Sequence, residues 1–178
     1  MQTITIDDEQ YIKVNGTWVD GGFIIPPTRV LRKILQAELA QIDIDTLSMA
    51  QLKTLVDETR DAECFDMCLR LVEKLIQKSL DAGDDETAQA YISTKCSCLR
   101  NLNDPAGAIE FCKQVRTEYG DEMLSVATLT SLAAAYCDLE QWADARLTCN
   151  FAYKKQGGGM GYANELSKVY KRIDANGR

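Results

Sequence analysis

The sequence predicts a mainly α protein, an α-solenoid of antiparallel helix pairs with a small β-hairpin at its N-terminus. Apolar residues recur with helical spacing from residue 28 onward, and helix start and stop signals divide this region into segments of about 14 to 18 residues. The first 27 residues instead alternate polar and apolar side chains, as a strand does. We therefore expect a hairpin with a proline-rich connector at 1–27 and a helical domain at 28–178.

The N-terminal segment has the pattern of a β-hairpin. Residues 3–6 alternate polar and apolar side chains, and a second apolar run ends at Asn15-Gly16. Asn-Gly between two such runs is a strong hairpin signal, because both central residues of the turn need a positive φ. We expect residues 3–24 to form an antiparallel hairpin whose Trp18 packs on the helices at 28–58, within the chain or across a homodimer.

Capping signals mark the ends of the helices that follow. Ser48 and Gln51 have the spacing of a capping box. Asp104 before a proline suits a helix start, and Gly120 suits a helix end that needs a left-handed residue. The helices expected in the second half of the chain cover 86–101, 105–119, 122–139, 142–156 and 163–175, with a glycine-rich break at 157–161.

A repeated pattern of small and large residues links these helices in pairs. One helix carries Leu129, Leu132, Ala133 and Tyr136, and the next carries Ala145, Cys149 and Ala152. The small residues allow paired helices to approach closely, while the large residues fill the space between turns. A weaker copy lies 37 residues earlier, with Lys95 where the pattern expects leucine.

This pattern resembles the tetratricopeptide repeat, a pair of antiparallel helices that stacks on its neighbours. The resemblance covers residues 86–175 well, 46–81 poorly and 1–45 not at all; a plain helical bundle is the alternative. It implies a solenoid with a C-terminal capping helix at 163–175 and a concave groove lined by the first helix of each pair. The partner-binding residues that it implies are Ser93, Ser97, Arg100, Asn101, Thr130, Asp138, Ser167 and Lys171.

The composition offers little to a catalytic site. The chain has 178 residues and no histidine, so the commonest general base and metal ligand is missing. Its seven cysteines stand at helix-packing positions, where a free cysteine acts as a small apolar residue. We expect reduced thiols and no cofactor, metal or enzymatic activity.

The charge distribution disfavours nucleic acid as a partner. The net charge is −7, and residues 151–178 carry six basic and two acidic residues, or +4, so residues 1–150 carry −11. An acidic body repels a phosphate backbone. No apolar run approaches the roughly 20 residues of a membrane span, and the N-terminus carries acids where an export signal has basic residues. We expect a cytoplasmic protein.

Two functions of different classes remain. The first is a non-catalytic adaptor or scaffold that binds another protein or peptide in the groove. The second is a structural subunit that forms a homodimer or larger assembly by strand addition through its N-terminal hairpin. A nucleic-acid-associated regulator that uses Arg29, Arg32 and Lys33 is a weaker third alternative.

Overall fold

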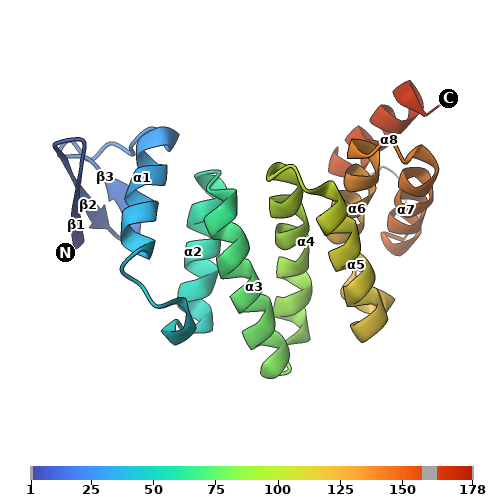
Figure 1. The fold of residues 1–178 in the computed structure, drawn as a ribbon, viewed down its shortest axis with the longest axis horizontal. Helices are drawn as coiled ribbons and strands as arrows, with labels where there is room; N and C mark the ends of the chain where they lie inside the picture. The colour runs from blue at the N-terminus through green and yellow to red at the C-terminus, as the bar shows by residue number, and fades with distance from the viewer. Residues whose placement is uncertain (1, 158–163, 178) are drawn as a thin grey trace. The chain divides into compact units, whose positions relative to one another are not determined.

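The chain folds into eight α-helices and one small antiparallel sheet within residues 2–157 and 164–177, the part that the structure, a computed structural model, describes (Figure 1). The strands are β1 (Gln2–Ile6), β2 (Glu9–Val14) and β3 (Thr17–Val19). The helices are α1 (Thr28–Leu39), α2 (Met49–Asp61), α3 (Phe65–Asp81), α4 (Asp85–Asn101), α5 (Pro105–Tyr119), α6 (Val126–Asp138), α7 (Trp142–Lys155) and α8 (Asn164–Asn176). Two 3₁₀ turns, η1 (Ile44–Thr46) and η2 (Asp121–Met123), complete the order. The prediction of a mainly helical chain with a small N-terminal β element is confirmed.

Contacts divide the chain into two compact units, residues 1–71 and 72–178. The first unit contains the sheet, α1, α2 and the start of α3. The second contains the rest of α3 and the helices from α4 to α8. The boundary expected after residue 27 lies inside the first unit, where the sheet packs on α1. None of the described helices is both long enough and apolar enough to cross a membrane.

Two tight turns build the sheet. Asn15 and Gly16 connect β2 to β3 with φ values of 50° and 84°, as expected for this dipeptide. Asp7 and Asp8 connect β1 to β2 in the same way, with φ values of 51° and 67°. The hairpin expected over 3–24 is therefore corrected to a three-stranded antiparallel sheet of order β1-β2-β3 that ends at Val19. The Asp7-Asp8 turn contains no glycine, the residue that signals a turn of this kind, so the sequence pattern did not predict it.

Aromatic side chains fix the sheet to α1. Tyr11 on β2 and Trp18 on β3 are buried and pack with Ile34 of α1. Val30 and Leu31 lie one turn earlier on the same apolar face of the helix and extend this cluster. The prediction that Trp18 packs on the first helices is confirmed, and the packing is within one chain.

Capping residues start most helices where the sequence predicts. Ser48 caps α2 through a capping box, and Asp104 caps α5. Gly120 follows α5 with a φ of 88°. The start of α6 is the main correction: the helix was expected from residue 122 and begins after Ser125, whose hydroxyl accepts a hydrogen bond from the Thr128 N–H.

The other expected helices agree with the structure to within a residue or so. Those expected at 86–101, 105–119, 142–156 and 163–175 are observed as α4, α5, α7 and α8. The glycine-rich break expected at 157–161 is described only at Gly157, which has a φ of 101°. Positions 158–161 lie outside the described residues.

Lys95 on α4 occupies a position where the repeat pattern expects leucine. Its Nζ lies 4.1 Å from the centre of the Phe111 ring and 3.0 Å from Glu73 Oε1. The aliphatic stem of a lysine can cover apolar surface while its charge is paired elsewhere. Lys95 can thus replace leucine without leaving an unpaired charge.

Small residues set the spacing of α6 and α7. Ala133 on α6 and Ala145 on α7 are fully buried, which allows the two helices to approach closely. Tyr136, which the repeat pattern places in the same interface, is only partly buried. The prediction of burial is therefore confirmed for Ala145 and corrected for Tyr136.

Replacing Ala145 with leucine is expected to destabilise the protein by about 1–3 kcal/mol, because the larger side chain has no space at a fully buried position. Urea unfolding measures the change. Ala143 lies on the same helix and is exposed, so Ala143→Leu is the matched control and should change stability by less than about 0.5 kcal/mol. Equal effects of the two substitutions would contradict the close packing of α6 and α7.

Candidate functional site

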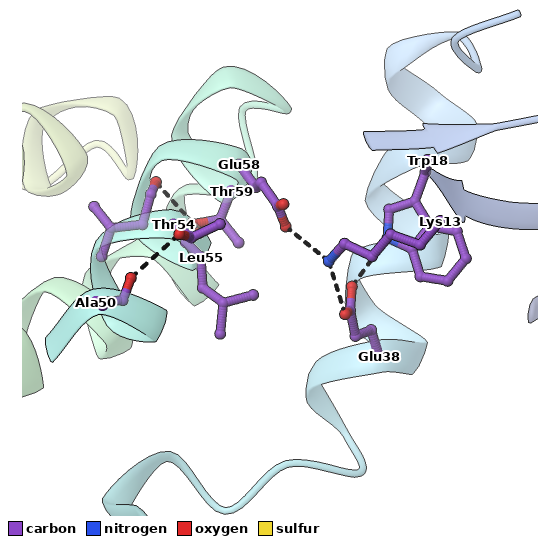
Figure 2. Close-up of polar contacts among 9 residues, drawn as sticks. Lys13, Trp18, Glu38, Ala50, Thr54, Leu55, Glu58 and Thr59 are labelled. Carbon is purple, nitrogen blue, oxygen red and sulfur yellow. Dashed lines mark hydrogen bonds and ion pairs between the residues drawn. The ribbon is translucent and has the colours of Figure 1, made fainter. Parts of the chain in front are cut away.

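A buried polar network joins the sheet to α1 and α2 (Figure 2). Glu38 on α1 is only 6% exposed, and its Oε2 accepts a hydrogen bond from Trp18 Nε1 at 3.0 Å. Its Oε1 lies 2.9 Å from Lys13 Nζ. The same ammonium lies 3.4 Å from Glu58 Oε2 on α2, so Figure 2 shows Lys13 between two carboxylates.

This network holds the sheet in place. Both carboxylate oxygens of Glu38 are used by partners within the chain, as buried polar groups require. Burial raises the pKa of the Glu58 carboxyl, and the nearby Lys13 opposes this shift only in part. Since both carboxylates face the same lysine and both oxygens of Glu38 have partners within the chain, we interpret the network as structural.

A second polar cluster forms within residues 72–178, at the ends of α4 and α6 and beside α8. Asp138, the last residue of α6, pairs with two arginines. Its Oδ2 lies 2.8 Å from Arg100 Nε on α4, and its Oδ1 lies 2.5 Å from Arg172 Nη1 on α8. A depression of about 390 Å³ opens at this cluster and is also lined by Asn101, Asn103 and Pro105.

The cluster keeps a positive charge, because two guanidinium groups share one carboxylate. Partial burial by itself would raise the pKa of Asp138, but the hydrogen bonds and charges of Arg100 and Arg172 outweigh it and hold the pKa below its ordinary value. Asp138 is therefore ionised at neutral pH and balances one of the two arginines. The Arg172 side chain is 41% exposed, so its remaining N–H donors can reach a carboxylate on a ligand.

The structure brings together three of the predicted partner-binding residues. Arg100, Asn101 and Asp138 line the same depression. Ser97 lies one helical turn before Asn101, and its carbonyl accepts a hydrogen bond from the Asn101 side chain at 2.9 Å. Arg172 completes the site and was missed, because the pattern on this helix pointed to Lys171 instead. Nothing in the sequence pattern distinguished it from the adjacent Lys171.

The other predicted residues lie elsewhere. Thr130 is buried, and its hydroxyl donates to the Val126 carbonyl at 2.7 Å. We therefore no longer count Thr130 among the partner-binding residues. Ser93 is partly buried, and its hydroxyl donates to the carbonyl of residue 90 at 3.0 Å. Ser167 and Lys171 lie on α8 and do not line the depression.

The seven cysteines are free and buried, which confirms that they are packing residues. The Sγ atoms of Cys96 and Cys112 lie 3.8 Å apart, and this contact together with burial raises the pKa of the Cys96 thiol. Burial raises the pKa of Cys149 to about 12. Within the part of the chain that is described, no group of three or more histidine, cysteine or acidic residues could hold a metal ion.

We expect an aromatic disulfide reagent at pH 8 to label no thiol rapidly in the native protein and all seven after unfolding. All seven thiols are buried, which keeps the reagent away from the sulfur atoms, and burial raises the pKa of thiols such as Cys137 and Cys149, so less of the reactive thiolate forms. Absorbance of the released thiolate counts the labelled residues. Fewer than seven after unfolding without a reductant would reveal a disulfide and contradict the prediction.

Comparison with known proteins gives no relative for this chain. No family model, no curated protein and no solved structure matches it. Its function therefore has to be inferred from its own residues.

Proposed function

We propose that this chain is a non-catalytic adaptor that binds an acidic segment of another protein at the depression formed by α4, α6 and α8. The observation that carries the proposal is the pairing of Arg100 and Arg172 with the single carboxylate of Asp138. One positive charge is left over at a site that solvent can reach. Asn101 and Asn103 add amide groups to the same depression. A carboxylate from a partner would balance the charge and accept guanidinium hydrogen bonds.

The arrangement of the helices supports a tetratricopeptide-like architecture. In such an array the first helix of each pair contacts the first helix of the next pair. Here α4 contacts α6, and α6 contacts α8, while α5 and α7 pair with the helices that precede them. The residues of the depression come from α4, α6 and α8, from the loop that follows α4 and from the first residue of α5. We propose that α8 serves as the capping helix of this array.

The same proposal accounts for the chemistry of the rest of the chain. With no histidine, the chain lacks the commonest general base, and we propose no catalytic role. Free buried cysteines suit a reducing compartment, so we propose a cytoplasmic location.

The test uses a short fluorescein-labelled peptide rich in aspartate and glutamate, and a lysine-rich peptide of equal length as its counterpart. Fluorescence anisotropy is expected to show binding of the acidic peptide alone, and added salt should weaken it. Arg172→Ala is expected to lower the affinity about tenfold, because it removes the exposed guanidinium. The matched control is Arg146→Ala, since Arg146 is 47% exposed and pairs with Asp174 away from the depression.

Two outcomes would contradict the proposal. One is equal binding of the acidic and the lysine-rich peptide, or no binding of either. The other is an equal loss of affinity in Arg172→Ala and Arg146→Ala, because the effect would then come from net charge and not from the depression.

A further inference from the structure

The sheet ends on one side at β1, whose outer edge has no partner strand among the described residues. β1 pairs only with β2, in the sheet order β1-β2-β3. It spans five residues, Gln2–Ile6, without a charge, a proline or a break in register. Proteins usually protect such an edge with lysine, proline, a bulge or a very short strand, because its free backbone groups can pair with another strand. β3, at the opposite edge, has only three residues, whereas β1 shows none of these protections.

The turn between β1 and β2 shows which backbone groups face this open edge. Ile6 and Glu9 flank the two-residue turn, so they exchange both hydrogen bonds of an antiparallel pair. Bonded and non-bonded pairs alternate along the strands, so Ile4 also directs its backbone groups to β2. The N–H and C=O groups of Thr3 and Thr5 therefore point the other way, toward the open edge.

The helix that packs on the sheet leaves this edge accessible. Lys33 of α1 pairs with Asp7 of the β1–β2 turn. Farther along the helix, Glu38 accepts a hydrogen bond from Trp18 on β3. α1 thus crosses the sheet from the β1–β2 turn toward β3, away from the open edge. Both threonine side chains of β1 are exposed, as this path of the helix requires.

We propose that two copies of the chain form a two-fold dimer in which their β1 strands pair edge to edge and antiparallel, centred on Ile4. Thr3 of one copy then lies opposite Thr5 of the other, and each such pair exchanges both backbone hydrogen bonds. Four hydrogen bonds join the copies and use every backbone group that the two threonines direct to the open edge. The two sheets become one continuous sheet. The dimer does not depend on the acidic-peptide site, which lies within residues 72–178.

The sequence of β1 favours a second copy as its partner, because the strand is complementary to itself. Thr3-Ile4-Thr5 reads the same in both directions. Antiparallel pairing about Ile4 therefore places threonine opposite threonine and isoleucine opposite isoleucine, and such cross-strand pairs stabilise a sheet. Since β1 carries no charge, no like charges face each other across the β1–β1 seam.

The acidic turn of the sheet does not oppose this pairing. Asp7 stands three positions after Ile4, so the Asp7 residues of the two copies lie six positions apart along the seam, at opposite ends. This separation is about 20 Å. It exceeds the Debye length, which is about 8 Å at physiological ionic strength. Each Asp7 is also paired with Lys33 of its own chain.

Sedimentation equilibrium of the full chain tests the proposal. A seam of five residues per copy is smaller than a standard interface of roughly 20–30 residues a side, so we expect a weak, reversible monomer–dimer equilibrium. Thr5→Pro is expected to weaken the dimer about tenfold or more, because proline removes an N–H from each side of the seam and none that bonds β2. Thr5→Ser keeps this N–H and is the matched control, with an expected change of less than about threefold. Circular dichroism checks that both variants are folded.

Two charge variants test the register and the choice of a second copy. Thr3→Lys combined with Thr5→Lys places lysine opposite lysine across the seam, and Thr3→Asp combined with Thr5→Asp places aspartate opposite aspartate. Each variant alone is expected to be monomeric, since like charges directly opposite each other destabilise a strand pair. An equimolar mixture is expected to form a heterodimer, because every lysine then faces an aspartate.

Three outcomes would overturn the proposal. The first is a full chain that stays monomeric at every concentration tested. The second is a dimer that Thr5→Pro leaves unchanged, since the copies would then meet at another surface. The third is a mixture of the two charge variants that associates no more strongly than either variant alone. All three concern β1, so they leave the test of the acidic-peptide site unaffected.

Discussion

Replacing Trp18 with alanine is expected to lower the free energy of unfolding of residues 1–71 by about 3–5 kcal/mol. The indole is buried between the sheet and Ile34, and its N–H satisfies the buried carboxylate of Glu38. Alanine would remove the indole from this apolar cluster and leave a cavity. Urea unfolding followed by circular dichroism measures the loss.

The neighbouring Thr17 provides the control for this substitution. Thr17 belongs to the same strand and is exposed, so Thr17→Ala should change the free energy of unfolding by no more than about 0.5 kcal/mol. A small effect of Trp18→Ala, comparable with that of Thr17→Ala, would mean that the sheet contributes little to the stability of residues 1–71.

Replacing Glu38 with alanine is expected to destabilise the same region by about 3–5 kcal/mol, because it leaves the ammonium of Lys13 and the N–H of Trp18 without their buried partner. Glu58→Gln is the comparison. Glu58 is more exposed and lies farther from Lys13, at 3.4 Å, so its loss should amount to about 0–1 kcal/mol.

A double substitution distinguishes the loss of charge pairing from the loss of shape. Lys13→Met combined with Glu38→Leu removes both charges and keeps the side chains similar in size. This variant is expected to recover part of the stability that Glu38→Ala loses, because the ammonium of Lys13 no longer stays buried without Glu38, while Glu58, which is more exposed, loses its lysine partner at a smaller cost. If it is as unstable as Glu38→Ala, the ion pair is not the source of the effect.

The sequence predicted most helices because the signals that start and end a helix act over a few residues. Asp104 satisfies an N–H group only three positions away, so α5 could be placed with its observed bounds. The Asp7-Asp8 turn was missed because its positive φ values depend on strand pairing more than on residue type. The local sequence pattern could therefore predict the bounds of α5. It could not predict that β1 pairs with β2 in a three-stranded sheet.

The polar clusters were harder to predict, because their members are far apart in sequence. Glu38 looks like a surface residue at the end of a helix, and only Lys13 and Trp18, 25 and 20 positions away, explain its burial. Arg100 and Asp138 followed from the repeat pattern, which places corresponding helix faces side by side. The repeat pattern did not predict Arg172, because helical spacing alone does not show whether Lys171 or Arg172 faces α6.

The short-range pairing of the helices in residues 72–178 has a consequence for how this part of the chain acquires its structure. Each of α4, α5, α6 and α7 mainly contacts helices one or two positions along the chain. The segments that must close are short, so little chain entropy is lost before a contact forms. Helical proteins rich in contacts between neighbouring elements fold in microseconds to milliseconds. During synthesis, each new helix from α5 to α8 would emerge to find a partner helix already made, and the structure could grow at the pace of translation.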